Sequence, residues 1–555
     1  MLTGVSGPAG ATEEAGGGLE QRPPRRTWRD RRAWWWAALA AGVLLLFYCA
    51  QREAQQLGVQ SDGAGMMLES WAMLHGNLLL SGWQVADVSF YTTELPEYML
   101  VELVRGLNPD VVRICDALTF TLLVVLAAAV AYGARPADRR AAAARAVITV
   151  AVMIGPTVLA ATTLLNDPDH TGTAVPILFA LLVLDRARRR WWVPVVVAAV
   201  LGWALVGDSL VLLIGVAPLV IVCGARSFGL LAVRREPLSA AWYDLSLAAA
   251  GLAAVVGGKA LSALIKANGG FVMSPSATHA TVPYTSLSAN VSATVNDFLG
   301  LFSADVFGAR LNDWLAVYAV HTVFACLVAG ALFLALRAFS RDFLNGDLIA
   351  QLLAVAIVIN LLAYLLLYPG SGATVREIAP IFGLGGALAG RVLGEPLLRR
   401  RLEPLIAVAA VVAVIMAVPP LLIVKPATPA AAGLARFLAA HDLTDGLAGY
   451  WNADSTMLDS RGAIVIAPVK YHRGYGLTAL PWEVQTRLFD SSDNDPNFLV
   501  ATAPGSPSDV TQAEAVAAFG QPDRRYSYHG YTIMVWHKNL LSQLPSAPPS
   551  RLDPR

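Results

Sequence analysis

Long apolar runs recur between residues 33 and 424, and they constrain the fold of this 555-residue chain more than any other feature. A helix that crosses the hydrocarbon core of a bilayer needs roughly 17–25 apolar residues, and several runs are that long. The whole chain is 56% hydrophobic and only 15% charged. The sequence therefore predicts a polytopic, all-helical membrane bundle of about eleven helices. The expected spans are residues 33–50, 115–133, 145–165, 171–185, 191–206, 209–224, 243–265, 316–337, 346–368, 375–392 and 403–424.

Basic residues fall on alternate connections between these runs. The connections on one side read RPADRRAAAAR, RARRR, ARSFGLLAVRR, RAFSRD and RVLGEPLLRRR, and they share that side with the basic N-terminal tail, residues 1–32. The positive-inside rule predicts that this side is cytoplasmic, with a disordered N-terminal tail inside and the C-terminus outside. The tail also matches a cleaved signal peptide, but the three tryptophans at 34–36 favour an uncleaved first span. The long outer loops are residues 51–114 and 266–315.

The C-terminal part is a different kind of sequence. Short strands are expected over 462–469, 497–504 and 531–538, and helical spacing occurs over 430–441, 481–490 and 509–519. Strands that alternate with helices predict a small α/β domain over residues 425–540, outside the membrane, followed by a disordered tail over 541–555.

Net charge and motifs exclude several classes of function. The formal net charge is +1, so no basic field points to nucleic acid. All four cysteines lie in or beside apolar segments, which indicates neither a disulfide framework nor a cysteine-based zinc site. The G-x-S-x-G, H-E-x-x-H and G-x-x-x-x-G-K-[ST] motifs are absent from the sequence. The common hydrolase, zinc-protease and P-loop mechanisms are therefore not indicated.

The first outer loop contains a candidate catalytic carboxylate. Asp62 precedes a segment in which Met67, Trp71 and Leu74 share one helical face, which predicts an amphipathic helix on the outer leaflet. Asp62 is either the N-cap of that helix, with the following glycines as turn residues, or a functional group. The two interpretations are compatible, because a capping aspartate is held rigidly.

The second outer loop reads Asn-Asp-Pro-Asp-His over residues 166–170. Proline favours an extended chain around itself, so the carboxylates of Asp167 and Asp169 point the same way. Two convergent carboxylates suit a hard divalent cation such as Mg²⁺ or Mn²⁺. His170 would assist as a ligand or proton carrier. The alternative is ordinary turn chemistry, for which these residues are equally typical.

A late outer turn carries a candidate phosphate ligand. Arg376 and Glu377 follow a Pro-Gly-Ser-Gly turn at the outer end of the tenth span. The guanidinium of Arg376 can bind a phosphate as a planar fork, or it can snorkel to the interface or pair with Glu377. The glycines of residues 383–386 indicate close helix packing and not a nucleotide loop.

Weaker candidates complete the set. Glu94 either lines an outer cleft or lies on the polar side of a second surface helix. Asp208 and Lys259 lie in or at the ends of spans, where ionisable residues are functional hypotheses, although Lys259 could simply snorkel. Residues 449–460 and Trp482 offer aromatic and polar groups of the kind that sugars favour, and core packing explains those aromatics equally well.

The layout of these motifs resembles a known superfamily. An acidic residue after the first span, a surface helix behind it, a D-x-D between the third and fourth spans, a late arginine and an outer C-terminal α/β domain resemble the GT-C superfamily of membrane glycosyltransferases. The likeness is greatest to bacterial members related to protein O-mannosyltransferases and to aminoarabinose transferases of lipid A. Many relatives carry two adjacent acidic residues in the first loop, whereas Asp62 is followed by glycine.

The resemblance implies roles for the candidate residues. Asp62 would deprotonate or orient the acceptor, and Asp167 and Asp169, next to His170, would bind a metal or position substrate. Arg376 would bind the phosphate of the lipid donor. The expected activity is transfer of a sugar from a polyprenyl phosphate to an envelope acceptor (lipid, polysaccharide or protein), at the outer face of the cell membrane and by an inverting displacement.

Two other functions remain open. A transporter or flippase of a lipid-linked solute would show inverted repeats and charged groups at the midplane, and no repeat is visible in the sequence. A non-catalytic GT-C-like scaffold would hold Asp62, Asp167 and Asp169 in separate places.

For the glycosyltransferase, the expected substrate-binding residues are Arg376, Glu94, His170 and Lys259.

Overall fold

The structure is a computed structural model of the chain. It describes residues 28–134, 138–166, 170–187, 189–274, 282–304, 315–368, 372–418, 422, 425–427, 430–505 and 508–545. The chain divides into two compact units, Met1–Leu45 and Leu46–Arg555. The described part of the first unit is the beginning of helix α1 (Trp28–Ala54), which exposes the apolar side chains of residues 34–36.

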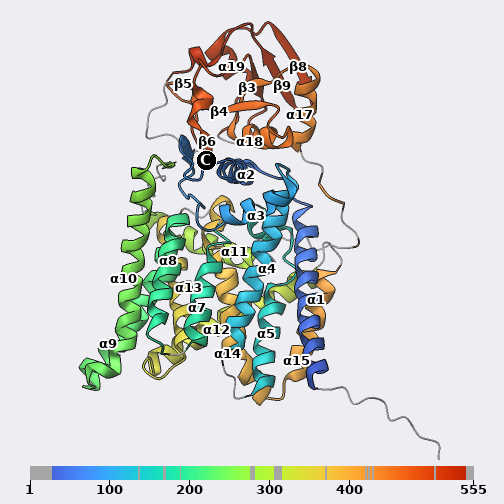
Figure 1. The fold of residues 1–555 in the computed structure, drawn as a ribbon. Coiled ribbons are helices and arrows are strands. Elements are labelled where there is room, and N and C mark those ends of the chain that lie inside the picture. The colour runs from blue at the N-terminus through green and yellow to red at the C-terminus, as the bar shows by residue number, and fades with distance from the viewer. Residues whose placement is uncertain are drawn as a thin grey trace, which may run out of the picture. The chain divides into compact units, whose positions relative to one another are not determined.

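The second unit contains a large helical bundle (Figure 1). Its helices are the rest of α1, α4 (Asp110–Tyr132), α5 (Arg139–Met153), α6 (Val158–Leu164), α7 (Ala174–Arg186), α8 (Trp192–Gly207), α9 (Ala217–Phe228), α10 (Leu238–Ala267), α12 (Leu315–Arg341), α13 (Leu348–Leu367), α14 (Pro380–Arg399) and α15 (Glu403–Ala417). Two π-helical segments, Leu212–Val216 and Gly229–Val233, extend α9 at its two ends.

Each predicted apolar run contains an apolar helix of this bundle. Among the described residues, seven helices are long and apolar enough to cross a membrane. The prediction of a helical bundle is thus confirmed, and these helices are consistent with a membrane protein. The number of eleven spans and their orientation stay predictions.

The third predicted span is wrong as a single helix. Residues 145–165 form the end of α5 and all of α6, with a break over residues 154–157. Gly155 has φ of +68°, a conformation that L side chains rarely adopt. The next residue, Pro156, has no backbone N–H to continue the helical ladder.

Helix α14 packs closely on α5, as the glycines of residues 383–386 predicted. A Cβ atom on Gly386 would lie 2.6 Å from Sδ of Met153, and one on Gly390 would lie 2.3 Å from the carbonyl oxygen of Arg145. No other residue fits at such separations, so these glycines set the distance between the two helices.

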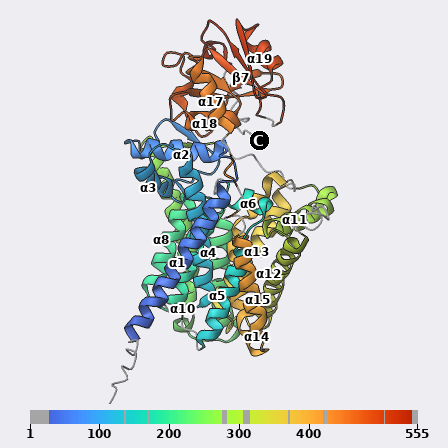
Figure 2. The same cartoon turned by 90° about the vertical axis from the view of Figure 1, so that its right-hand side faces the viewer.

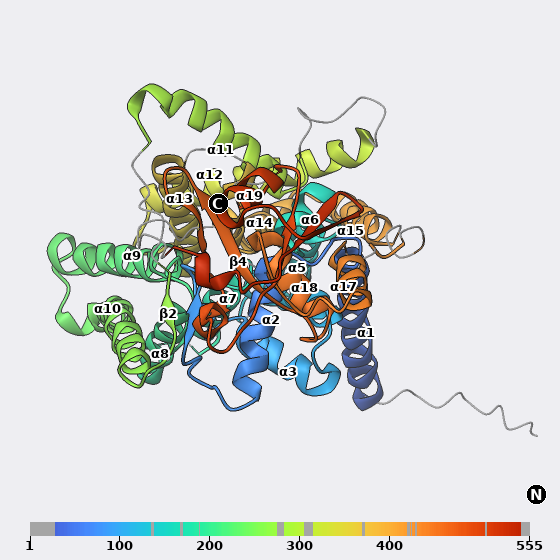
Figure 3. The ribbon, with the colours of Figure 1, turned by 90° about the horizontal axis from the view of Figure 1, so that it is seen from above.

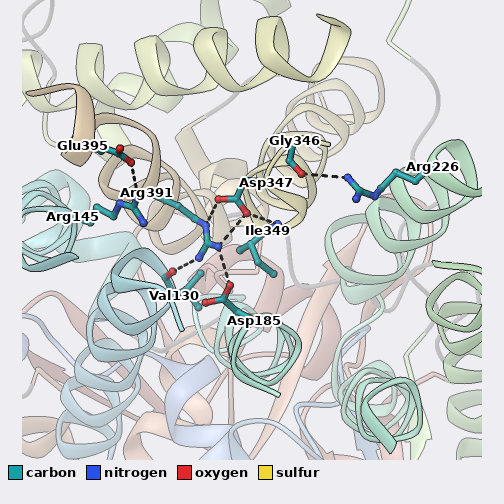
Figure 4. A network of polar contacts seen from close by, with 9 residues as sticks. All are labelled: Val130, Arg145, Asp185, Arg226, Gly346, Asp347, Ile349, Arg391 and Glu395. Atoms are coloured by element: carbon teal, nitrogen blue, oxygen red, sulfur yellow. Dashed lines mark hydrogen bonds and ion pairs between the residues drawn. The ribbon is translucent and has the colours of Figure 1, made fainter. Parts of the chain in front are cut away.

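A buried arginine joins four helices of the bundle (Figure 4). Arg391 of α14 bonds through Nε to Oδ2 of Asp347 at 2.5 Å and through Nη2 to Oδ1 of Asp185 at 2.8 Å. Its Nη1 donates to the carbonyl oxygen of Val130 at 2.6 Å. Asp347 also caps α13 by accepting from the N–H of Ile349. This contact set connects α14 with α13, α7 and α4.

Several shorter elements pack beside the bundle (Figures 1 and 2). They are α2 (Ser61–Leu74), α3 (Leu95–Arg105), α11 (Leu287–Leu301), β1 (Trp83–Val85) and β2 (Val272–Met273). Helix α2 contacts α3 on one side and α18 (Tyr450–Asp459) on another (Figure 3). Most residues of α2 are buried, so α2 is an internal helix and not the leaflet-bound helix that the sequence predicted.

The C-terminal part contains a six-stranded sheet in the order β5-β4-β3-β7-β9-β8. Its strands are β3 (Asp445–Ala448), β4 (Val465–His472), β5 (Gly476–Ala479), β7 (Phe498–Ala501), β8 (Arg524–Tyr528) and β9 (Tyr531–Val535), and its helices are α17 (Ala430–Ala440), α18 and α19 (Gln512–Phe519). Strand β3 is parallel to β4 and β7, and the other pairs are antiparallel. The predicted α/β character is confirmed. The helix predicted over 481–490 is wrong, because β6 (Val484–Gln485) and a 3₁₀ turn occupy that stretch.

A second, very small sheet joins three distant parts of the chain. Strand β1 pairs in parallel with β2, with Gln84 opposite Val272, and antiparallel with β6, with Trp83 opposite Gln485. The order is β2-β1-β6. The pairing of β1 with β6 holds the residues just before β6 next to the loop that follows α2.

Candidate functional site

Asp62 lies in the first turn of α2 and contacts two other segments of the chain. The N-cap of α2 is Gln60, which makes no side-chain capping bond, so the prediction of Asp62 as the N-cap is wrong. Its Oδ2 lies 3.3 Å from Nη1 of Arg376, and its Oδ1 accepts a 2.5 Å hydrogen bond from the hydroxyl of Tyr450. The side chains of Asp62 and Arg376 are each 18% exposed. Both groups are therefore held in place and still reachable from solvent.

Tyr450 shares its hydroxyl between two carboxyl groups. The hydroxyl contacts Asp62 and also Oε2 of Glu483. A phenol has one proton to donate, so the second contact requires that the carboxyl of Glu483 donates to the phenol oxygen. Burial, with the charges of Asp62 and Glu69 close by, raises the pKa of Glu483 well above its usual range. Glu483 is thus protonated and directs the hydroxyl of Tyr450 toward Asp62.

Two further carboxyl groups lie beside Glu483. Glu69 of α2 and Asp454 of α18 are almost completely buried. Burial raises the pKa of Asp454 well above its usual range, and the charge of Asp62 raises it further. Burial, with the carboxyl of Asp454 close by, also raises the pKa of Glu69 well above its usual range. We call Glu69, Tyr450, Asp454 and Glu483 the acidic cluster.

Small local features hold the acidic cluster against Asp62. The hydroxyl of Ser61 donates to the carbonyl oxygen of Tyr450 at 2.7 Å and ties the start of α2 to the start of α18. A Cβ atom on Gly65 would lie 2.8 Å from Oε2 of Glu483. The sequence interpretation of this glycine as a turn residue is wrong, because it lies inside α2 and makes room for Glu483.

Glu377, the residue after Arg376, contacts a second group of polar side chains. Arg376 and Glu377 lie in a 3₁₀ turn, Gly372–Ile378, just before α14. Arg376 pairs with Asp62, whereas Oε2 of Glu377 lies 3.4 Å from Nε2 of His170. The other ring nitrogen, Nδ1, lies 2.7 Å from Oδ2 of Asp208. Arg376 and Glu377 thus connect the two loops that contain Asp62 and His170.

His170 is held in an uncommon backbone conformation. Its φ is +58°, in the left-handed region that costs an L residue roughly 1–2 kcal/mol. Its side chain is buried between two carboxylates, and Asp208 also accepts from Thr173 and from the N–H of Leu210. These contacts offset the backbone strain. We call His170, Thr173, Asp208 and Glu377 the histidine cluster.

Glu94 lies next to the histidine cluster. It is buried and therefore does not lie on the polar side of a surface helix. Burial raises its pKa well above the usual range, and the charges of Asp208 and Glu97 raise it further. A Cβ atom on Gly172 would lie 2.1 Å from Oε1 of Glu94, so this glycine provides the space for the carboxyl group.

The remaining predicted residues lie elsewhere. Lys259 is exposed on α10, and no contact of the described residues joins it to either cluster. Asp167 and Asp169 lie outside the described residues, so the cation site that they were expected to form stays a prediction. Within the described ranges, no group of three or more His, Cys, Asp or Glu side chains is arranged to hold a metal ion.

Several site residues were missed or undervalued by the sequence reasoning. Asp208 was a weak candidate at a span end, and Tyr450 was noted only as one aromatic among others. Nothing in the sequence around Glu69 or Glu483 marks them, because their partners lie hundreds of residues away. Trp482, which the sequence offered as a sugar contact, is buried against Tyr450 and Leu480 and belongs to the core.

Comparison with known proteins adds a structural likeness. No protein-family model matches the chain, and neither does any curated protein. A crystal structure of the oligosaccharyltransferase of Archaeoglobus fulgidus, in complex with zinc and sulfate, is similar over 82% of this chain and 68% of that one, with 12% sequence identity and a TM-score of 0.46. A likeness of this size assigns neither a family nor an activity.

Proposed function

We propose that the chain is a membrane glycosyltransferase of the GT-C type, which transfers a sugar from a polyprenyl phosphate to an envelope acceptor. The observation that carries this proposal is that Asp62 pairs with Arg376 while the adjacent Glu377 contacts His170. Three segments chosen from the sequence for one reaction meet at one place. A scaffold without catalytic function has no need for this convergence.

Arg376 is the proposed ligand of the donor phosphate. A guanidinium offers two parallel N–H donors to a phosphate, and its charge stabilises the oxygen that gains negative charge as the bond breaks. Nη1 of Arg376 lies 3.3 Å from Oδ2 of Asp62. A phosphate on Arg376 competes for that guanidinium and releases Asp62 for a new partner. Donor binding therefore prepares the base.

Asp62 is the proposed general base. The acceptor oxygen forms a bond to the anomeric carbon as the bond from that carbon to the phosphate oxygen breaks, and the electron pair leaves with the phosphate. The acceptor proton passes to Asp62. A single displacement of this kind inverts the anomeric centre. Tyr450 and Glu483 act as positioning residues, because Glu483 already holds a proton and fixes the direction of the Tyr450 hydroxyl.

The proposed setting is the outer face of the cell membrane, where a sugar on a polyprenyl phosphate presents its phosphate at the headgroup level. Glu94 and the adjacent histidine cluster, which includes His170, would lie on the donor side of the site. We retain a divalent cation at Asp167 and Asp169 as a separate proposal, and no step above depends on it. Lys259 is left without a role, since it is exposed on α10.

The test is transfer of radiolabel from polyprenyl-phosphate sugars by the purified full-length chain. We expect Asp62→Asn and Arg376→Gln to lower transfer strongly. Asp442→Asn is the matched control, because Asp442 is exposed and its positive φ of +56° suits asparagine. Undiminished transfer by Asp62→Asn would remove the proposed role of that residue. Absence of transfer by the unaltered chain would favour the scaffold or the transporter.

A further inference from the structure

A cavity of about 430 Å³ lies beside the acidic cluster, between α2, β1 and the segment that contains β6. Small-molecule sites have volumes of roughly 300–1,000 Å³. The side chains that line it include Trp71 of α2, His75 directly after α2, Trp83 of β1, Asn77 and Arg487. All five lie outside the helices that could cross a membrane. The cavity thus lies outside the helices that could cross a membrane.

Two buried carboxyl residues belong to the cavity wall. Asp454 and Glu483 both line it. Asp454 is completely buried, and neither of its carboxyl oxygens has a hydrogen-bond partner among the described residues. Nε1 of Trp83 is likewise buried without a partner in the described part of the chain. A buried polar group without a partner costs about 1–3 kcal/mol, and a ligand that bonded to these atoms would recover that cost.

The lining indicates the chemistry of that ligand. The rings of Trp71 and His75 lie 4.1 Å apart and form an aromatic wall, on which the apolar face of a sugar ring can stack. Hydroxyl groups both donate and accept hydrogen bonds, and a protonated carboxyl such as Asp454 does the same. Arg487 lines the cavity, and its positive charge repels an ammonium group. Burial also raises the pKa of Asp454 well above its usual range. A neutral sugar therefore fits better than an amino sugar.

We propose that this cavity is a binding subsite for a neutral sugar unit, so that the acceptor of the transfer is a carbohydrate. The inference deepens the proposed function and rests on it. Glu483 lines the cavity and also bonds to Tyr450, which donates to Asp62. The cavity thus adjoins the proposed base but is separated from it by these two side chains. The reacting hydroxyl consequently belongs to a neighbouring unit of the same acceptor.

The experiment measures binding without any donor. Saturation-transfer difference NMR is recorded on the full-length chain in nanodiscs with three neutral probes, the methyl glycosides of mannopyranose, galactopyranose and arabinofuranose. Methyl glucosaminide and the tripeptide Ala-Ser-Ala represent an amino sugar and a peptide acceptor. The variants are Trp71→Ala and Arg487→Ala. Trp242→Ala is the matched control, since Trp242 lies on α10 and is 43% exposed.

We expect at least one neutral glycoside to bind, and Trp71→Ala to weaken that binding by about fivefold to tenfold. Arg487 is exposed, so its replacement should weaken binding without affecting folding. Trp242→Ala should bind as the unaltered chain does. The proposal is overturned if no neutral glycoside binds, if Trp71→Ala and Trp242→Ala behave alike, or if the amino sugar or the peptide binds more tightly. Loss of transfer with sugar binding intact would overturn only the proposed function.

Discussion

The hydroxyl of Tyr450 donates to Oδ1 of Asp62 at 2.5 Å, although 388 residues separate the two along the chain. This bond places a residue of the C-terminal α/β part in direct contact with the candidate base of the first outer loop. The same hydroxyl contacts Glu483, so the orientation of Asp62 depends on two C-terminal residues. The α/β part is therefore a component of the candidate site.

Tyr450→Phe should lower transfer much more than it lowers stability. The substitution removes the hydroxyl that orients Asp62, and a misplaced catalytic group can lower a rate roughly 100-fold. We expect kcat to fall while KM for the donor stays near its original value, because Arg376 is untouched. Steady-state kinetics with a polyprenyl-phosphate sugar test this. Tyr475→Phe, at a side chain that is 58% exposed, is the control. An equal loss of kcat in both variants would contradict the positioning role.

The ion pair between Asp62 and Arg376 should show energetic coupling. Asp62→Asn, Arg376→Gln and the double variant form a double-mutant cycle, read out as free energies of unfolding in detergent. We expect an interaction of about 0.5–3 kcal/mol, because both side chains are largely shielded from water. The pair of Glu395 and Arg399, with side chains 41% and 78% exposed, should give at most about 0.5 kcal/mol. Additive effects at Asp62 and Arg376 would refute the coupling.

Arg391→Gln should destabilise the bundle strongly. It removes the guanidinium that holds Asp185 and Asp347 (Figure 4). The pair with Asp185 is largely shielded from water, and breaking such a pair costs about 3–5 kcal/mol. The side chain of Asp347 is 44% exposed, so its pair adds less. The midpoint of thermal unfolding should fall clearly below that of the unaltered chain. Arg337→Gln, at an exposed position of α12, should change it little. A midpoint for Arg391→Gln that matches Arg337→Gln would show that the network is dispensable.

Gly172→Ala should disturb the site through Glu94. The added Cβ would lie 2.1 Å from Oε1 of Glu94, so the carboxyl must move within a packed interior, at a cost of about 1–3 kcal/mol. Adding Glu94→Ala to this variant should recover part of the loss. Gly257→Ala is the control, because nothing lies within 4 Å of the new atom and alanine favours the helix. Unchanged unfolding of Gly172→Ala would contradict the close contact.

Glu97 should make stability depend on pH. Burial raises the pKa of Glu97 from 4.5 to about 7, against a smaller lowering by its bond from Thr119. The folded chain then holds a proton that the unfolded chain releases, so unfolding free energy is highest below pH 4.5 and falls as pH rises to about 7. The slope from this one group is at most about 1.4 kcal/mol per pH unit. Glu97→Gln lacks it. Parallel curves for the two proteins between these pH values would exclude the effect.

Much of the helical part follows from the sequence, because apolar runs must be buried in protein or lipid wherever they occur. The third predicted span is an exception, because its apolar run forms two helices and not one. The Gly155–Pro156 pair marks this break in the sequence. Helix α2 was also recognised from its spacing. Its burial under α18 was not, because that contact depends on the folded position of a segment far along the chain.

The candidate site likewise contains residues that the sequence identified and residues that it did not. Asp62, His170 and Arg376 were chosen because each carries recognisable chemistry in its own outer loop, and the structure brings these segments together. Glu69 and Asp454 carry no local signal. Their importance arises from burial and proximity, which are properties of the fold. The roles of all these residues stay predictions until they are measured.

The three-stranded sheet β2-β1-β6 can be completed only late in the synthesis of the chain. Strand β1 is made early, but its partners follow only when residues 272 and 484 have left the ribosome. Ser61 and Tyr450 are 389 residues apart, which at roughly 5–20 residues per second means a delay of about 20–80 s during synthesis. During that interval Asp62 lacks its C-terminal hydrogen-bond partner, Tyr450. A chain truncated before Tyr450 would therefore enter the membrane with its helices but without a finished site.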